Sequence, residues 1–279
     1  AGASYSLGGP PTFIALNHAS TWLPAFKMYV DTTAGVAPFG VLPFGEYGKP
    51  VVHASSTAPA LHRTPILPTG AASIAIRTTA RLDASGGIAG DSETTATGPF
   101  AVGIRQLAVV IERAGAEQAA VYQLRSTGNE GTGKFQFDQP FDQALTYHLG
   151  GHFQLTPRSD YLTGNSFGPP MGLAVGWRPG DELLGPLDLL DVRGNEPTPC
   201  YNGHEVLDLS LELPPGKHVR ELPQGKDISN QYVSYRSRWS VSGRTVSVHR
   251  ELTTTVDQAV CIGEVRRGLQ AFEAELRGL

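Results

Sequence analysis

The residues of this 279-residue chain that are best suited to chemistry are His18 and Asp31. They lie in two short stretches with strand-like composition, Ile14–Trp22 and Lys27–Asp31, and Pro24 between the stretches predicts a turn. If the stretches pair as antiparallel strands, the Asp31 carboxylate can fix the tautomer of the His18 imidazole and leave its other ring nitrogen facing a nucleophile. That arrangement is typical of covalent catalysis. The alternative is that both residues are structural.

A nucleophilic cysteine is absent from the sequence before His18, because Cys200 and Cys261 both lie far downstream. Neither cysteine belongs to a Cys-x-x-Cys pair. His204 follows Cys200 at a spacing seen in zinc sites, but no further ligands are apparent. The cysteines are therefore free thiols, a disulfide or half of a metal site, and their spacing does not decide between these alternatives.

A second histidine pair, His148 and His152, has the i,i+4 spacing of helical metal-binding motifs. It lies in a strand-like stretch and lacks the glutamate of a metalloprotease helix, so we predict no metal site there. Gly128–Gly133 is glycine-rich without the Lys-Ser/Thr ending of a phosphate-binding loop, and it predicts a turn. We accordingly predict neither a bound metal nor a cofactor.

The elements that must position these residues are mainly β-strands. Gly (33 residues) and Pro (21 residues) are frequent and show no Gly-X-Y period, which favours a chain with many turns. Alternating apolar residues predict one hairpin from Ile74 to Thr97, with its turn at Asp83–Gly87. A second hairpin is predicted from Tyr232 to Leu252, with its turn at Ser242-Gly243.

Two helical regions interrupt or end this β pattern. Pro99 and Gly115 are suited to begin and end a helix, and a second short helix follows, so we predict an αα-hairpin at about residues 99–127. Apolar residues from Ile262 to Leu276 recur at helical spacing and predict a closing amphipathic helix. Residues 52–70 contain three prolines and predict a linker or wrapping segment. The predicted fold class is mainly β, antiparallel and β-sandwich-like, with the inserted αα-hairpin and the C-terminal helix.

Composition excludes some partners. The net charge of −4 and the pI near 6.1 argue against a nucleic-acid-binding protein, because phosphate binding needs clustered cations. The densest aliphatic stretch, Leu107–Ile111, is far too short to span a bilayer. The N-terminus, Ala1–Ser4, has neither a signal peptide nor an initiator Met, and we expect a processed or truncated product.

Three segments carry a resemblance to a known family: Phe13–His18, Met28–Thr33 and Ala37–Phe44. They resemble the end of a transglutaminase-like catalytic core, within the papain-like superfamily whose catalytic residues follow the order Cys, His, Asp. More narrowly, the chain is similar to the C-terminal part of bacterial transglutaminase-like proteins with flanking β domains of unknown function. The resemblance implies that His18 is the general base and Asp31 its orienting partner.

The resemblance also implies a division of the chain and a function. Residues 1–60 would be the terminal strands and loop of the catalytic core, and residues 61–279 a C-terminal β-rich domain. Because the family's cysteine precedes its histidine and none does here, we predict a non-catalytic fragment that is inactive as this chain. The intact protein would perform acyl transfer or amide hydrolysis on a protein or peptide substrate, and its N-terminal remainder would be the partner of this chain. The alternative is a stand-alone β-sandwich binding or scaffolding module of the cell envelope, with His18 and Asp31 as structural residues.

Proteins of this resemblance group are generally exported, which implies a periplasmic or cell-surface location. An oxidising compartment favours a disulfide between Cys200 and Cys261, which would tie the loop before the strand at Val206 to the start of the final helix. The alternative, for a chain that stays in the cytoplasm, is two separate buried thiols.

Overall fold

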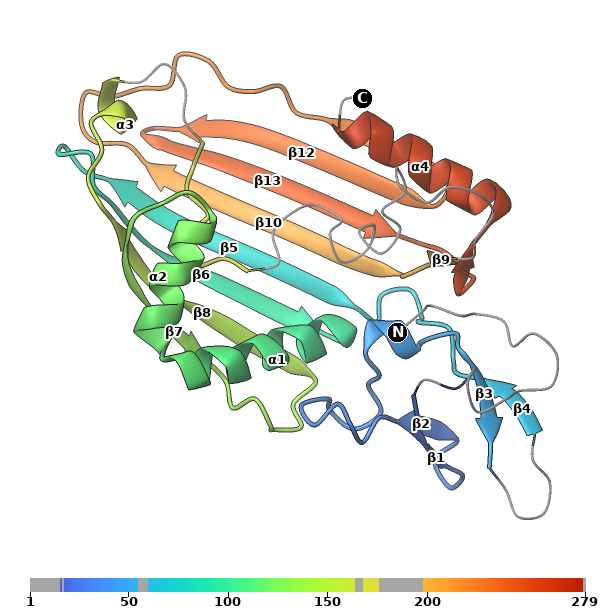
Figure 1. The fold of residues 1–279 in the computed structure, drawn as a ribbon. Helices are drawn as coiled ribbons and strands as arrows, with labels where there is room; N and C mark the ends of the chain where they lie inside the picture. The colour runs from blue at the N-terminus through green and yellow to red at the C-terminus, as the bar shows by residue number, and fades with distance from the viewer. Residues whose placement is uncertain (1–15, 17, 55–59, 164–167, 176–197, 278–279) are drawn as a thin grey trace.

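The computed structural model describes residue 16 and residues 18–54, 60–163, 168–175 and 198–277 of the chain. Its dominant feature is an eight-stranded sheet with helices packed against it (Figure 1). A smaller N-terminal region of two short hairpins and a connecting loop lies beside one end of this sheet. Within the described residues, none of the helices combines the length and the apolar composition needed to cross a membrane.

The large sheet consists of two antiparallel groups of strands that meet at a parallel pair. The strand order is β11-β12-β13-β10-β5-β6-β8-β7; β10 and β5 run parallel, and the other neighbours run antiparallel. The strands are β5 (Ser73–Leu82), β6 (Ile88–Thr97), β7 (Gly131–Phe137), β8 (Thr146–Leu155), β10 (Gly203–Glu212), β11 (Asp227–Ser229), β12 (Val233–Ser242) and β13 (Thr245–Thr254). Both predicted hairpins, β5–β6 and β12–β13, are confirmed.

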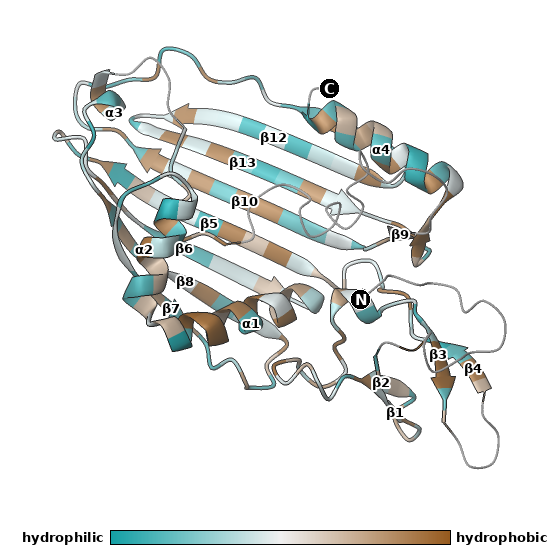
Figure 2. Cartoon of the chain, viewed as in Figure 1, coloured by the Kyte–Doolittle hydropathy of each residue, from teal (hydrophilic) through white to brown (hydrophobic). Residues whose placement is uncertain are grey.

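Alternation along the strands decides which face of the sheet is buried. In β5, Ile74, Ile76 and Thr78 are buried and the residues between them are exposed. Because side chains alternate between the two faces of a strand, one face of the sheet is apolar and the other is polar and open to solvent. Figure 2 shows this alternation as bands of opposite hydropathy along the central strands.

Helices cover the apolar face. The predicted αα-hairpin is confirmed as α1 (Pro99–Ala114) and α2 (Ala116–Ser126), inserted between β6 and β7. Gly98 precedes α1 at φ +59°, and a Cβ there would lie 2.1 Å from the carbonyl oxygen of Ala71, so the entry to the helix requires glycine. A single helical turn, α3 (Asp160–Thr163), follows β8, and the closing helix is confirmed as α4 (Gly263–Arg277).

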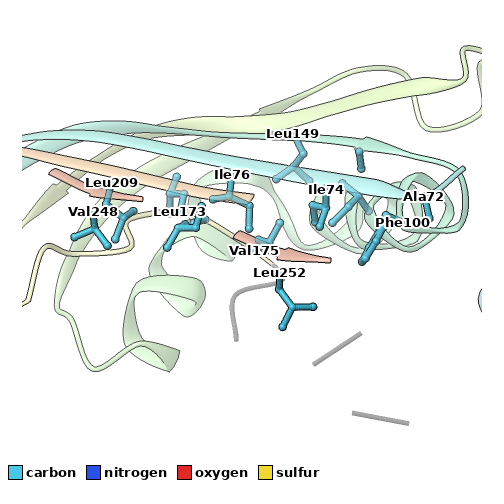
Figure 3. Packing of buried hydrophobic residues seen from close by; sticks show 14 of the residues in the cluster. Ala72, Ile74, Ile76, Phe100, Leu149, Leu173, Val175, Leu209, Val248 and Leu252 are labelled. Carbon is cyan, nitrogen blue, oxygen red and sulfur yellow. The ribbon is translucent and has the colours of Figure 1, made fainter. Parts of the chain in front are cut away.

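One buried apolar cluster joins these layers. It combines the inward residues of the sheet with α1, α4 and the segment 171–175, and Figure 3 shows its centre around Ile76, Leu173 and Leu209. The mainly β class is therefore confirmed. In the described residues the partner of the large sheet is this helical layer rather than a second large sheet, because the apolar stripes of α1 and α4 already bury the inward face.

A fully buried arginine attaches the loop between β7 and β8 to α1. The Arg105 guanidinium is 0% exposed and donates hydrogen bonds to the carbonyl oxygens of Pro140 (2.9 Å), Asp142 (2.9 Å) and Ala144 (2.7 Å). It also pairs with the Asp142 carboxylate at 2.7 Å and lies over the Tyr147 ring, 4.4 Å from its centroid. One side chain therefore holds several backbone groups of a loop that has no regular structure.

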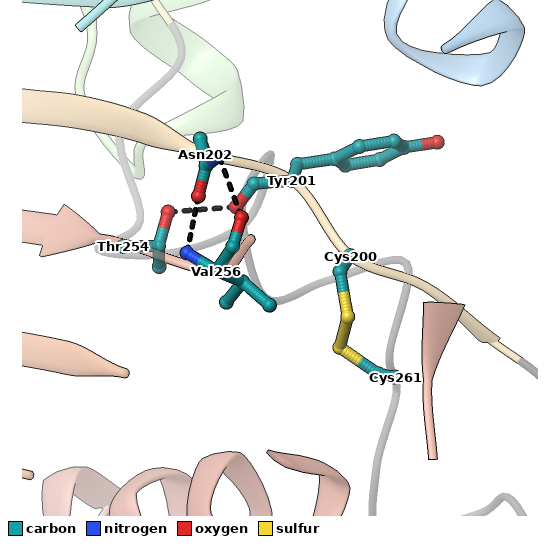
Figure 4. The surroundings of a disulfide bond; sticks show 6 residues. All are labelled: Cys200, Tyr201, Asn202, Thr254, Val256 and Cys261. Carbon is teal, nitrogen blue, oxygen red and sulfur yellow. Dashed lines mark hydrogen bonds between the residues drawn. A yellow bond between two sulfur atoms is a disulfide. The ribbon is translucent and has the colours of Figure 1, made fainter. Parts of the chain in front are cut away.

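A disulfide between Cys200 and Cys261 confirms the predicted pairing (Figure 4). The cysteines lie at a small two-stranded sheet of β9 (Thr198–Pro199) and β14 (Val260–Cys261). Beside the bridge, the buried Asn202 amide donates to the carbonyl oxygens of Leu67 (2.8 Å) and Val256 (2.7 Å) and accepts from the Val256 N–H. The bridge and this amide together fix the entry to β10 and the approach to α4.

The N-terminal region contains β1 (Thr21–Leu23), β2 (Met28–Val30), a 3-10 turn η2 (Phe44–Glu46), β3 (Pro50–His53) and β4 (Ala60–Arg63). The end of β3 and all of β4 lie in residues 52–70, which were predicted to be a linker or wrapping segment, and there they pair as a hairpin instead. Thr64 and Leu67, which follow this hairpin in the sequence, are both buried. Pro65 and Pro68 lie after β4, so neither interrupts a strand of the hairpin.

Candidate functional site

His18 and Asp31 flank the β1–β2 hairpin. Thr21 pairs with Val30, His18 lies shortly before β1, and Asp31 directly follows β2. The prediction that His18 lies within a strand is therefore wrong, and Asp31 likewise lies just beyond its strand. The physical reason is local: the Asp31 carboxylate accepts hydrogen bonds from the Thr33 N–H (2.8 Å) and hydroxyl (2.7 Å), an Asx turn that ends the strand.

The two side chains nevertheless meet. His18 Nε2 lies 3.3 Å from Asp31 Oδ1, which confirms the expected approach, while the catalytic role stays a prediction. The Asp31 side chain is 3% exposed and the His18 side chain 39% exposed. Within the described part of the chain, no hydrogen-bond partner is found for the other ring nitrogen, Nδ1.

Glu46 is a third member of the site that the sequence does not mark. Its Oε1 lies 3.4 Å from His18 Nε2, and its side chain is hydrogen-bonded to Asp31. Glu46 follows a Gly in a Pro- and Gly-rich loop, and nothing in its spacing from His18 or Asp31 marks it. Only the folding of that loop against the hairpin brings the carboxyl to the imidazole.

The two carboxyl groups have opposite pKa shifts. Burial, then the hydrogen bond to Asp31 and the charge of Asp31, raises the pKa of Glu46 to about 8. Burial also raises the pKa of Asp31, but hydrogen bonds from Glu46 and Thr33 outweigh it and lower that pKa to about 2. At neutral pH, Glu46 is therefore the proton donor and Asp31 the ionised acceptor of a shared hydrogen bond.

Contacts with α1, with the segment before β10 and with the residue after β4 hold η2 in place. The Phe44 ring packs edge-on against Phe100 of α1, with centroids 5.0 Å apart, and against Tyr201, with centroids 4.8 Å apart. The Thr64 hydroxyl donates to the backbone carbonyl of Glu46 at 2.6 Å. Glu46 is thus positioned by the β-rich part of the chain, whereas His18 and Asp31 are positioned by the first hairpin.

An aromatic and imidazole cluster joins the two N-terminal hairpins. Trp22 of β1 and Tyr29 of β2 pack with centroids 4.7 Å apart, and the Tyr29 hydroxyl lies 2.6 Å from His53 Nε2 in β3. The His53 ring stacks on His62 of β4 at 4.0 Å. These contacts restrict the hairpin that carries the site.

Replacement of Glu46 by Gln is expected to remove a pH-dependent part of the stability. Folded Glu46 keeps a proton that the unfolded chain releases above about pH 4.5, its ordinary pKa. The stabilisation is therefore complete below that pH and is lost as the pH rises through about 8. We expect the stability advantage of wild type over Glu46→Gln to fall as the pH rises from about 5 to 8, measured by urea denaturation.

The matched control is Glu221→Gln, which changes an exposed carboxyl outside the regular elements. Its free-energy difference from wild type should stay constant over the same pH range. If the difference in unfolding free energy between wild type and Glu46→Gln did not vary with pH, this would contradict the assignment of a proton to folded Glu46.

The other candidate residues do not assemble a site. His148 Nδ1 pairs with Asp138 at 2.8 Å on the polar face of the sheet, with both side chains about half exposed. His204 pairs with Glu251 at 2.9 Å, and Cys200 is bridged, so the zinc alternative for the cysteines is wrong. Among the described residues, the group of metal-ligating side chains that converges is His18, Asp31 and Glu46.

Comparison of the chain with protein-family models, with curated proteins and with solved structures finds no match.

Proposed function

We propose that this chain is the non-catalytic C-terminal part of an exported transglutaminase-like protein, and that His18 and Asp31 form the base half of its acyl-transfer site. The supporting observation is the contact of the imidazole with a buried carboxylate: Nε2 lies 3.3 Å from Asp31 Oδ1, and the His18 side chain is 39% exposed, which leaves part of it open to a further group. The disulfide is compatible with an oxidising compartment.

The proposed chemistry follows from this contact. With its proton on Nε2 and directed at Asp31, the neutral imidazole keeps the Nδ1 lone pair free to accept a proton. A cysteine thiol placed against Nδ1 would lose its proton there, and the thiolate would attack the carboxamide carbon of a protein or peptide substrate. The imidazolium would return the proton to the departing ammonia or amine, while Asp31 stabilises the charged ring. An amine would then consume the thioester by acyl transfer, or water would hydrolyse it.

The test is to restore the missing half. The 279-residue chain alone should neither hydrolyse nor cross-link a glutamine-containing peptide, since it has no thiolate next to His18. A chain extended by its upstream coding sequence should form a thioester that mass spectrometry detects. His18→Ala in the extended chain should slow turnover by about 10²–10⁴-fold, as expected for loss of a general base.

The control in the extended chain is His148→Ala, which removes an exposed, carboxylate-bonded histidine elsewhere and should leave turnover unchanged. Turnover by the 279-residue chain that survives purification and disappears with His18→Ala would refute the proposed division of the active site. An upstream sequence without a cysteine at a helix start would refute it as well.

One observation favours the alternative, a stand-alone binding or scaffolding module. The polar face of the large sheet is open and carries cross-strand ion pairs, including Arg238 with Asp227 (2.9 Å) and His249 with Asp208 (2.8 Å). Such a face offers a broad, flat surface to a polar partner. A start codon directly before Ala1 would favour this alternative.

A further inference from the structure

The distances within the His18 site are those expected between ligand atoms of one metal ion. His18 Nε2 lies 3.3 Å from Asp31 Oδ1 and 3.4 Å from Glu46 Oε1. Both distances exceed the usual hydrogen-bond range of about 2.7–3.2 Å. A tetrahedral zinc ion with bonds of about 2.0–2.2 Å separates its ligand atoms by about 3.3–3.6 Å. The two distances from His18 Nε2 match that spacing, and the ligand atoms of all three donor groups lie within 4.8 Å of one another.

Convergence and support at the site favour the same ligand. Both carboxyl groups lie near the same imidazole nitrogen, so three potential ligand atoms gather around one position. A divalent cation bound there would compensate the charge of both carboxylates once Glu46 has lost its proton. The Asp31 carboxylate is held by the Thr33 N–H and hydroxyl, which is the outer-shell support that metal-binding carboxylates usually have.

The donor set selects among cations. Calcium and magnesium prefer oxygen ligands throughout, whereas one imidazole nitrogen with two carboxylate oxygens suits zinc. The Asp31 and Glu46 side chains are 3% and 16% exposed, so two ligands are held rigidly. The His18 side is more open, which leaves access for the ion and for a fourth ligand such as water.

We propose that His18 Nε2, Asp31 and Glu46 form a zinc site with one open coordination position. Zinc binding itself does not depend on the acyl-transfer proposal, because it requires no nucleophile. If both proposals hold, the zinc ion binds His18 Nε2, the nitrogen that would otherwise donate its proton to Asp31. Zinc would then keep His18 from acting as the base.

The experiment is isothermal titration of the metal-free 279-residue chain with Zn²⁺ at constant pH and ionic strength. We expect saturable binding of one ion per chain. His18→Ala, Asp31→Asn and Glu46→Gln should each lower the affinity by at least about 10-fold, since each removes a ligand. Co²⁺ in place of zinc should show the visible absorption of a four-coordinate nitrogen- and oxygen-ligated ion, and this absorption should disappear in the same three variants.

The matched control is His148→Ala, which removes a histidine with the same kind of carboxylate partner and should leave zinc affinity unchanged. Circular dichroism confirms that each variant is folded before titration. Failure to saturate at one ion, or equal affinity in wild type and Glu46→Gln, would overturn the zinc site. Because the readout is binding, an extended chain that binds zinc but is inactive in its metal-free form would refute the acyl-transfer proposal alone.

Discussion

Arg105→Ala is expected to lower the free energy of unfolding by at least about 3 kcal/mol, because a buried polar group that loses its hydrogen-bond partner costs about 1–3 kcal/mol and several lose theirs here. The substitution removes the donors for the carbonyl oxygens of Pro140, Asp142 and Ala144 and leaves those groups without their partner. It also opens a cavity beside Tyr147, whose ring the guanidinium covers. The measurement is urea denaturation followed by circular dichroism.

Two variants make this result specific. Arg113→Ala changes an exposed arginine in the last turn of the same helix and should cost less than about 0.5 kcal/mol. Arg105→Lys keeps the charge but replaces a planar group of five donors by a single ammonium, so it should recover only part of the loss. If Arg105→Lys were as stable as the wild type, the positive charge, and not the set of guanidinium hydrogen bonds, would hold the loop.

Loss of the Cys200–Cys261 bridge is expected to have an effect of similar size. The bridge joins residues separated by 61 positions, and closing a loop of that length stabilises a fold by about 4 kcal/mol in the chain-entropy model. Cys200→Ala combined with Cys261→Ala should therefore lower the unfolding midpoint in urea substantially. Alanine is the suitable replacement because both positions are buried and a serine hydroxyl would add its own cost.

Thiol titration and reductant provide the controls for the bridge. The denatured, unreduced wild type should have no titratable thiol, and two free thiols per chain would contradict the disulfide. Reductant should lower wild-type stability to the level of the double variant and leave the double variant unchanged. Equal stability of the oxidised wild type and the double variant would show that the bridge contributes little to the fold.

Local patterns predicted the elements of this fold well. The hairpins β5–β6 and β12–β13 could be predicted because buried residues recur at every second position along most of β5, β12 and β13. The αα-hairpin could be predicted because Pro99 begins α1 and Gly115 separates α1 from α2. Each of these cues acts within a few residues of the element that it specifies.

Features that depend on distant residues were not predictable in this way. Glu46 reaches His18 only because Phe44 packs between Phe100 and Tyr201, residues far along the chain. Arg105 has the composition of a solvent-facing residue, and its burial depends on a loop more than thirty residues later. The pairing of β10 with β5 has no local marker at all, since parallel partners need no shared turn.

That parallel pair has a consequence for the order in which the chain folds. β5, β6, β7 and β8 pair among residues 73–155, and β10, β11, β12 and β13 pair among residues 203–254, so each group can assemble from contacts that are close along the chain. In the described sheet, the two groups are joined by the pairing of β10 with β5, from His204 with Ser73 to Glu212 with Arg81, residues about 130 positions apart. Closing so long a stretch is slow compared with forming hairpins. The joining of two preformed halves along β5 and β10 is therefore the step that should limit the rate of folding.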